Sequence, residues 1–573
     1  MPDTAPVLAS ARRLPTLFDA VAVLCILGAL AYVAGVARGT LAPLPEAEAI
    51  SLDPAHLPGY AVRTTLRLFA AMLVSLLFTF TYATLAAKSR RAGMVLVPVL
   101  DVLQSVPILG FLSFTVVFFL QLFPGRVLGA ELAAIFAIFT SQAWNMAFSF
   151  YYALKTLPPD LVEAARAYRL SPWQRFWRLE VPFAMPGLVW NSMISMSGGW
   201  FFVVASEAVT VGDTAFKLPG IGSYVAVALE QRDFAAVLYA IGAMAVVILA
   251  YDQLLFRPLV AWSGKFRMEA PPGADDDDPW VLAALRRAPL LRRVGAGVGA
   301  AFDRFAGLRW PAFGREAAAR RPPARALDLA WFALLAALAG VALWRVAAFV
   351  GGVLAPADLA EALRLGCYTL LRVAVLIALA SLVWVPVGVW LGLRPAWAQR
   401  AQTATQFLAA FPANLFFPVF VVVIVRFSLD PDIWLTPLMV LGAQWYILFN
   451  AIAGAAALPS DLREAARQFR VGGWLRWRRV LLPGIAPHYV TGATAASGGA
   501  WNAAIVSEVA SWGDTRLAAQ GLGAYIARAT EAGDGARVLL GVAVMAGFVV
   551  LLNRLLWNPL HARASRRVGA GAG

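Results

Sequence analysis

The sequence predicts an all-α polytopic membrane protein of about twelve transmembrane helices, arranged as two tandem six-helix repeats. An apolar composition and an internal duplication carry this prediction. The chain has 573 residues, of which 60% are hydrophobic and 14% are charged. Soluble domains carry about 25% charged and about 45–50% apolar residues. The composition therefore argues against a soluble enzyme.

The apolar runs define the predicted helices in order. Each is long enough to cross a bilayer and about twice the length of a barrel strand, which favours helices over a barrel. The first run follows Arg12 and Arg13 and is longer than the apolar region of a signal peptide, so we expect a retained helix. The runs lie near 17–37, 64–87, 94–120, 128–153, 184–208 and 235–257, and near 327–350, 367–393, 403–426, 434–457, 485–509 and 537–557.

Positive charge concentrates in alternate loops and in the C-terminal tail, for example at Lys88, Arg394 and Arg567. Such residues mark cytoplasmic loops. The opposite loops carry acidic residues such as Asp53 and Asp430. Both termini are therefore expected in the cytoplasm. The same loops explain the net charge of +15, so nucleic-acid binding is not expected.

A polar gap divides the chain into three parts. We expect a first half at 1–261, a cytoplasmic linker at 262–326 and a second half at 327–573. The linker is rich in Arg, Ala, Pro and Gly. Around Trp280 to Arg293 it has the pattern of a short amphipathic helix on the membrane surface.

The two halves match each other when the sequence is shifted by 301 residues. Glu163-Ala164-Ala165-Arg166 falls on Glu464-Ala465-Ala466-Arg467, and Ser206-Glu207 falls on Ser507-Glu508. Most matched positions are polar, Gly, Pro or Trp, so shared hydrophobicity does not explain them. An even number of helices per half gives both halves the same orientation. They can then pack about an axis along the membrane normal, as parallel repeats do in several transporter classes.

An ordered, aromatic loop joins the fourth and fifth predicted helices of each half. In the first half, Pro158-Pro159 can begin a short helix, Ser171-Pro172 a second one, and Pro182 closes it before the next span. Aromatic residues such as Trp173 favour a docking surface on the cytoplasmic side. The alternative is an interfacial helix with its aromatic residues at the lipid headgroups.

This loop resembles the EAA loop of bacterial ABC importer permeases. The family pattern is Glu-Ala-Ala, three residues, Gly, nine residues, Ile, one residue, Leu-Pro. The first half has Glu163, Ala164 and Ala165, then Leu179 and Val181-Pro182. The second half repeats the spacing with Glu464, Ala465 and Ala466, then Val480 and Leu482-Pro483.

Both loops depart from the family pattern at its Gly position, which is Arg169 in one half and Arg470 in the other. A glycine there relaxes the turn after the first short helix. Because Arg resists positive φ, we expect this turn to be made differently here.

The resemblance implies a type I ABC importer permease fold, and a role for each loop as a coupling helix. Two copies of a cytoplasmic ATPase subunit would bind the two loops. ATP and Mg²⁺ would then bind the partner ATPase, and no cofactor would bind this chain. A periplasmic or lipid-anchored binding protein would deliver the substrate across a bacterial inner membrane. The implied docking residues are Glu163, Ala164, Ala165, Arg169, Trp173, Pro182, Glu464, Ala465, Ala466, Arg470, Trp474 and Pro483.

The later part of the match most resembles the nitrate/sulfonate/taurine group, which implies uptake of a small anion. Its cues are the Trp and Ser-Glu of the fifth helix and the Gly-x-Gly that follows, here Gly220 and Gly222. Arg63, Arg67 and Arg372, near helix ends, could favour anions or simply anchor the helices. The outer turns Gly212-Asp213-Thr214 and Gly513-Asp514-Thr515 would lie near the binding-protein face.

The fifth helix of each half carries polar residues on one face. Ser197, Trp200 and Glu207 share a helical face in the first half. Charged groups in hydrocarbon usually face a path or a partner, so this face either lines a translocation path or forms a helix–helix interface. The path candidates are Ser197, Trp200, Glu207, Trp501, Asn502 and Glu508.

Other functions have little support in the sequence. The two cysteines and three histidines form no metal-binding or disulfide pattern. The single Gly-Lys pair, Gly264-Lys265, lacks the rest of a phosphate-binding loop, so the chain is not expected to be an ATPase. The competing interpretation is a secondary transporter without an ATPase partner, which would leave the doubled loop unexplained.

Overall fold

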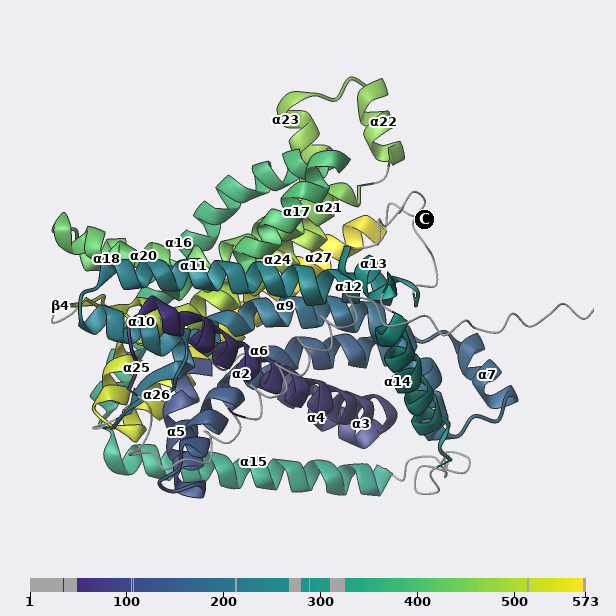
Figure 1. Ribbon diagram of the computed structural model, residues 1–573. Helices are drawn as coiled ribbons and strands as arrows, with labels where there is room; N and C mark the ends of the chain where they lie inside the picture. Colours follow the sequence, from purple (N-terminus) through teal and green to yellow (C-terminus); the bar gives the residue numbers. More distant parts are fainter. Residues whose placement is uncertain are drawn as a thin grey trace, which may run out of the picture. The chain divides into compact units, whose positions relative to one another are not determined.

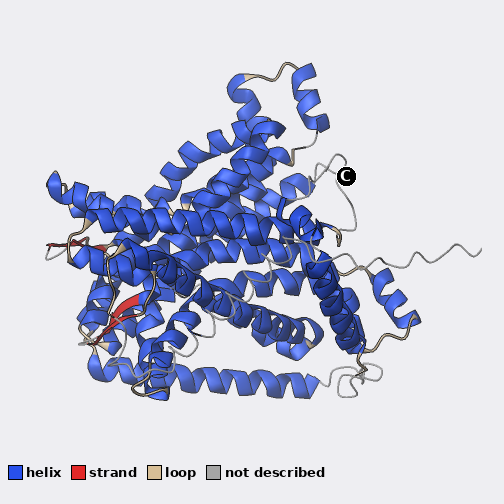
Figure 2. Cartoon of the chain, viewed as in Figure 1, coloured by secondary structure: helices blue, strands red, loops and turns tan. Residues whose placement is uncertain are grey.

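The described part of the protein is almost entirely helical in a computed structural model (Figures 1 and 2). The structure describes residues 35, 49–104, 106, 108–211, 214–266, 280–287, 289–309, 325–458, 460–512 and 515–569. Apart from Gly35, the predicted span at 17–37 lies outside these residues.

The first half contains eleven described helices and one hairpin. They are α2 (Leu57–Phe78), α3 (Thr84–Lys88), α4 (Arg90–Leu103), α5 (Ile108–Leu122), α6 (Val127–Lys155), α7 (Pro159–Ala167), α8 (Pro172–Arg175), α9 (Val181–Glu207), the antiparallel pair β1 (Ala208–Val211) and β2 (Thr214–Lys217), α10 (Ile221–Glu230), α11 (Phe234–Tyr251) and α12 (Arg257–Gly264).

The linker and the second half follow. The linker has α13 (Trp280–Arg287) and α14 (Pro289–Gly307). The second half has α15 (Arg325–Val353), α16 (Pro356–Gly392), α17 (Pro395–Ala410), α18 (Phe417–Arg426), α19 (Pro431–Trp434), α20 (Thr436–Leu441), α21 (Gln444–Ala456), α22 (Ser460–Gln468), α23 (Gly473–Arg476), α24 (Leu482–Ser507), the antiparallel pair β3 (Val509–Trp512) and β4 (Thr515–Ala518), α25 (Leu522–Glu531), α26 (Gly535–Leu552) and α27 (Asn558–Gly569).

The duplication extends to irregularities of the backbone. Single π-helical turns at Phe176–Glu180 and Asp252–Phe256 recur at Trp477–Leu481 and Asn553–Trp557, each 301 residues later. Such turns are rare within α-helices. Their recurrence indicates that the two halves repeat one local geometry as well as one sequence pattern.

Six described helices are long and apolar enough to cross a membrane, judged by length and composition: Pro54–Lys88, Val127–Lys155, Pro172–Glu207, Phe234–Gly264, Pro356–Gly392 and Gly535–Ala564. Two bent pairs would raise the number to eight: Ala404–Ala410 with Ala413–Arg426, and Pro431–Leu441 with Gln444–Ala456. The runs predicted at 327–350 and 485–509 are helical as α15 and α24. The total of twelve spans stays a prediction.

The third predicted span is a continuous helix in neither half. In the first half, α4 ends at Leu103 and α5 begins at Ile108. In the second half, the chain bends by 78° where Phe411 and Pro412 interrupt the helix. Proline disfavours helical geometry in the residue before it, and Phe411 is accordingly extended, with ψ 126°. Hydrophobicity alone therefore gave the position of these segments but not their break.

The described chain forms two compact units. One contains Ala153–Trp190 and Ala250–Arg320, and therefore holds the first aromatic loop together with α14. The other contains Leu41–Tyr152, Asn191–Leu249 and Arg321–Gly573.

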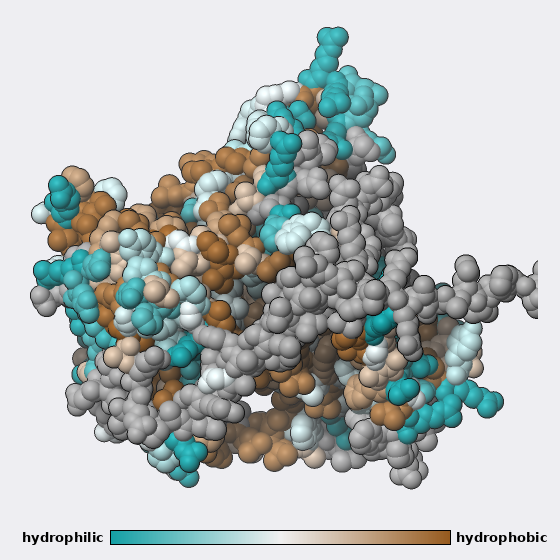
Figure 3. Space-filling view, viewed as in Figure 1, coloured by the Kyte–Doolittle hydropathy of each residue, from teal (hydrophilic) through white to brown (hydrophobic). Residues whose placement is uncertain are grey.

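Small residues allow the helices of the larger unit to approach closely. A side chain at Gly388 would meet Ala451, and one at Gly392 would meet the carbonyl of Ile452, so α16 packs directly on α21. Close backbone approach of this kind is typical of membrane helices, since lipid offers no hydrophobic drive for association. Apolar side chains cover much of the described surface, whereas hydrophilic ones gather over α22 and α23 (Figure 3).

Candidate functional site

The aromatic loop of each half consists of two short helices joined by a tight turn. In the first half, α7 begins at Pro159 and α8 begins at Pro172. Ser171 caps α8 by accepting from the Gln174 N–H at 3.2 Å, and the Gln174 side chain accepts from the Ser171 N–H at 3.0 Å. This is a capping box, which confirms that Ser171-Pro172 begins a second helix.

The turn between the two short helices takes the conformation that its sequence disfavours. Arg169 and Arg470 have φ values of 51° and 52°. The Arg169 N–H bonds to the Arg166 carbonyl, and the Leu170 N–H bonds to the Ala165 carbonyl. This is the pattern of a Schellman helix end. The expectation that Arg would change the turn is wrong, because closing these two bonds requires the left-handed conformation whatever the residue.

The predicted docking residues divide into exposed and buried sets. Glu163 and Ala164 are exposed, whereas Ala165 is buried. In the second half, Glu464 is exposed, Ala465 is intermediate and Ala466 is buried. Each loop therefore anchors one alanine and presents its glutamate outward.

Pro182 does not end the second short helix, contrary to expectation. One helix runs without interruption from Pro172 to Glu207, and the π-helical turn at Phe176–Glu180 lies just before Pro182. In the second half, Pro483 likewise lies in the first turn of α24, directly after Trp477–Leu481. A wider turn at this point is consistent with the N–H that proline lacks.

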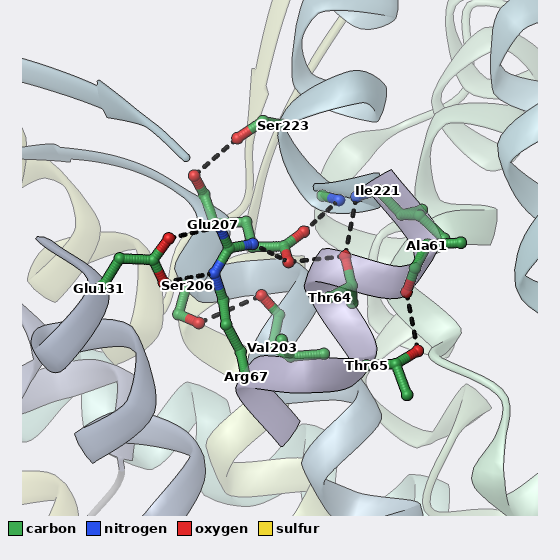
Figure 4. A network of polar contacts seen from close by, with 11 residues as sticks. Ala61, Thr64, Thr65, Arg67, Glu131, Val203, Ser206, Glu207, Ile221 and Ser223 are labelled. Atoms are coloured by element: carbon green, nitrogen blue, oxygen red, sulfur yellow. Dashed lines mark hydrogen bonds and ion pairs between the residues drawn. The ribbon is translucent and has the colours of Figure 1, made fainter. Parts of the chain in front are cut away.

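A buried ionic network lies at the end of α9 (Figure 4). The Glu207 carboxylate accepts from Arg67 Nη1 at 2.6 Å and from Thr64 Oγ1 at 2.7 Å. Arg67 also forms a two-pronged pair with Glu131, at 2.6 Å and 2.7 Å. Glu207 is 0% exposed and Arg67 is 5% exposed. Because buried charges are tolerated only when they are paired and hydrogen-bonded, this network is a single interdependent unit.

The network also holds the beginning of α10. The Gly222 N–H donates to Glu207 at 2.7 Å, and the Ile221 N–H donates to Thr64 at 3.0 Å. The first N–H groups of a helix have no partner within the helix, and a carboxylate near them is favoured by the helix dipole. A side chain at Gly220 would collide with the Glu207 carboxylate. The Gly-x-Gly pattern therefore makes room for Glu207.

The second half repeats this arrangement in a more open form. Glu508 accepts from Thr369 at 2.8 Å and from the Ala524 N–H at 3.0 Å. Arg372 lies farther away, at 3.3 Å, and divides its donors between Glu508, Asp432 and the Gln520 carbonyl. The Asp432 side chain is 41% exposed, against 10% for Glu131. An open pocket is lined by Tyr368, Leu371, Arg372, Asp432 and Gln520.

Sequence reasoning missed Thr64, Thr369, Glu131 and Asp432. Glu131 and Asp432 obey the shift of 301, but Thr64 and Arg67 match Thr369 and Arg372 only at a shift of 305. A search that allowed a gap would have found Thr-x-x-Arg in both halves. The structure also shows that carboxylates neutralise Arg67 and Arg372, so these arginines anchor helices and do not present free positive charge.

A mainly apolar cavity of about 100 Å³ lies within the larger unit and takes residues from both halves. Of the six path candidates, Ser197 and Asn502 line it. Trp200 and Trp501 are buried at 0% and 1% exposure and do not line it. Asn502 also accepts the Ile108 N–H at 2.8 Å, which fixes the start of α5 against α24. The cavity is lined by Ser197, Gly198, Phe201, Phe202, Ala409, Phe411, Ala413, Leu438, Met439, Gly442, Ala443, Tyr446, Gly499, Asn502 and Ala503.

The two outer turns are only partly described. Residues 212, 213, 513 and 514 lie outside the described residues, so the structure does not test their expected position near a binding-protein face. Within the described residues, no group of three or more His, Cys, Asp or Glu could hold a metal ion.

These features define a multi-pass helical membrane protein built from two copies of one unit, each with an exposed loop and a Thr–Arg–Glu network. The sequence profile of the binding-protein-dependent transport system inner membrane component matches residues 57–256 and 384–568. The chain belongs to this family. It is therefore a transport permease with two tandem domains, and not itself an ATPase.

Individual relatives are distant. The bicarbonate transport system permease protein CmpB of Synechocystis sp. is 29% identical over 132 residues, which is 22% of this chain and 45% of CmpB. The nitrate import permease protein NrtB of Leptolyngbya laminosa is 26% identical over 188 residues, 33% of this chain and 64% of NrtB. The glycine betaine/proline betaine transport system permease protein ProW of Escherichia coli is 26% identical over 190 residues, 33% of this chain and 49% of ProW. The chain thus spans less than two thirds of the length of each of these relatives.

Proposed function

We propose that this one chain supplies both membrane halves of an ATP-driven ABC importer. The observation that carries the proposal is the pair of exposed loops, each with the same helix end at Arg169 or Arg470 and the same outward glutamate. Such a loop has no evident use in a secondary transporter. Two loops with the same helix end and the same outward glutamate suit two copies of one ATPase subunit. The division into halves at 1–261 and 327–573 with a linker at 262–326 belongs to the same proposal.

The partners follow from the family. Two cytoplasmic ATPase subunits bind ATP and Mg²⁺ and engage the loops. A periplasmic or lipid-anchored binding protein docks at the other end of the permease. Both termini then lie in the cytoplasm of a bacterial cell, and the protein lies in the inner membrane. Glu207 and Glu508 come at the C-terminal ends of α9 and α24, and the loops come before the N-terminal ends of the same helices. This order supports a loop on one side of the membrane and a network on the other side in each half.

The translocation path runs through the cavity lined by Ser197 and Asn502 from the two halves. Alternating access needs a site that both halves can open and close. This cavity meets that need because both halves contribute residues to its lining. Movement of the loops by the ATPase turns the path outward or inward.

The substrate class that we favour is a small oxyanion such as nitrate, bicarbonate or a sulfonate. The relatives CmpB and NrtB are named for bicarbonate and nitrate, whereas ProW is named for betaines. No charged side chain lines the cavity, and an unpaired anion is costly in such surroundings. We infer that selectivity resides mainly in the binding protein and that the cavity conducts without tight binding.

The test compares the wild type with Glu163→Lys, Glu464→Lys in a pull-down from mildly solubilised native membranes. We expect an ATP-hydrolysing subunit to be retained by the wild type alone, and ATP-dependent uptake to be lost in the double variant. Glu361→Lys changes an exposed glutamate on α16, a helix that belongs to neither loop, and is the charge-matched control. Normal uptake by the double variant would overturn the role of the loops. Uptake that needs no ATPase subunit would favour a secondary transporter.

Uptake of labelled nitrate, bicarbonate, taurine and glycine betaine then tests the substrate class. Transport of betaine alone would contradict the oxyanion assignment.

A further inference from the structure

The linker helix α14 packs on the first aromatic loop. Trp173 Nε1 donates to the carbonyl of Phe305 at 2.9 Å, and Gln174 Nε2 donates to the carbonyl of Gly307 at 2.8 Å. Both carbonyls lie in the last turn of α14, where carbonyl groups have no partner within the helix. The loop therefore caps the end of α14 with two side-chain donors.

Aromatic rings reinforce this contact. Phe305 packs edge-on against Trp173 and Trp177, with ring centroids 5.0 Å and 5.4 Å apart, and Phe302 packs on Trp177 at 5.7 Å. Edge-to-face pairs at these distances are favourable beyond the area that they bury. The contact thus combines hydrogen bonds with aromatic packing, while Glu163 on α7 stays exposed.

The second loop lacks two of the three residues that make this contact. The positions of Gln174 and Trp177 are occupied by Leu475 and Arg478, which supply neither the amide donor nor the indole ring. Trp474, which corresponds to Trp173, is 72% exposed. The two repeats therefore differ at two of the three positions that touch α14, although they match at Trp173 and Trp474 and at Glu163 and Glu464.

The second loop also has fewer local constraints. Ser171-Pro172 of the first loop is replaced by Gly472-Gly473, so the side-chain cap of α8 has no counterpart in α23. Glycine lacks the conformational restriction of proline and costs more entropy to order. Sequence and packing thus agree that the first loop is held more firmly than the second.

We propose that α14 is a dedicated brace for the first coupling loop, which makes the two docking elements of this importer unequal. The first loop presents Glu163 from a pre-ordered support, whereas the second loop presents Glu464 without one. Pre-ordering lowers the cost of binding, so the ATPase subunit on the first loop is held more tightly. This last consequence rests on the proposed function, but the brace itself does not.

The brace is tested first on the purified full chain in detergent by hydrogen–deuterium exchange. In a Phe302→Ala, Phe305→Ala variant, we expect amides in 172–180 to exchange roughly tenfold faster, since local opening sets their rate. Residues 473–481 of the second loop should not change. Val298→Ala is the matched control, because Val298 lies on the same helix and is 65% exposed. Unchanged exchange in 172–180 would overturn the brace.

Retention of the ATPase subunit then tests the inequality. In the wild-type background, we expect Glu163→Lys to reduce retention more than Glu464→Lys. In the Phe302→Ala, Phe305→Ala background, the two single changes should reduce it equally. Equal losses in the wild-type background would overturn the inequality. If neither the wild type nor any variant retains an ATPase subunit, the proposed function fails. The hydrogen-exchange result still shows whether α14 supports the first loop.

Discussion

The guanidinium of Arg67 lies 2.6 Å from the Glu207 carboxylate, whereas the corresponding pair, Arg372 and Glu508, lies at 3.3 Å. The Arg67–Glu207 pair is buried. Arg372 also pairs with Asp432, whose side chain is partly exposed. The two halves therefore keep one architecture at different levels of burial. Their response to the loss of the arginine should differ accordingly.

Arg67→Met should destabilise the protein more than Arg372→Met. Removing Arg67 leaves two carboxylates, Glu131 and Glu207, buried without their partner, which costs about 3–5 kcal/mol. Removing Arg372 also leaves a buried carboxylate, Glu508, but Glu508 keeps its bonds to Thr369 and the Ala524 N–H. The Asp432 side chain is 41% exposed and can turn to water, so the cost should be lower, about 1–3 kcal/mol. Thermal unfolding of the purified chain in detergent measures both. Equal losses of stability would contradict the difference in burial on which this prediction depends.

Gly222→Ala should destabilise the protein by about 1–3 kcal/mol, as expected for overpacking. Its new methyl group would collide with the Val204 carbonyl, a backbone atom of α9 that cannot turn aside. Gly242→Ala is the control, since nothing lies within 4 Å of a methyl group there, and alanine favours the helix by about 1 kcal/mol. Melting temperature and the monodisperse fraction after gel filtration report the outcome. A neutral Gly222→Ala would show that α9 and α10 are not in close contact.

The sequence predicted the repeated helices and the pair of loops, and it singled out Glu207 and Glu508 as path or interface residues. It could do so because these features rest on local pattern: apolar runs, a fixed motif and a shift of 301 residues. In the structure both carboxylates lie in buried networks between helices and do not line the cavity. The sequence did not predict the roles of Thr64 and Glu131, because these roles depend on the packing of helices far apart in the chain. The break in the third predicted span of each half was also not predicted, since hydropathy gives no information about a bend.

The turn at Arg169 and Arg470 shows why a residue preference can mislead. Arg is disfavoured at positive φ, but the cost is small enough for two hydrogen bonds at the helix end to outweigh it. At Arg232 the first half again has Arg at a φ of 56°, where the second half has Gly533 at 68°. The backbone conformation of each helix end is thus kept in both halves, even where the residue is one that disfavours positive φ.

Arg169→Gly and Arg470→Gly should each make the turn more stable by roughly 0.5–1 kcal/mol, because the left-handed penalty outweighs the entropy of glycine. The measurement is slower hydrogen exchange of the Leu170 and Val471 amides, which close the two turns. Gly533→Arg is the reverse control and should speed exchange at Asp534, whose N–H closes the equivalent turn. If both glycine variants exchange faster, the side chains of Arg169 and Arg470 stabilise these turns by contacts that outweigh the strain.

Gly198→Leu should block transport without loss of the fold. Gly198 lines the cavity, and its nearest neighbour there is the Tyr446 hydroxyl, 3.9 Å from the position of a new methyl group. A leucine side chain would occupy much of a cavity of about 100 Å³. We expect uptake to fall to background while ATPase retention and melting temperature stay at wild-type values. Gly547→Leu on α26 adds the same volume in open space and should transport normally. Wild-type uptake by Gly198→Leu would show that substrate crosses the membrane by another route, because a filled cavity cannot conduct.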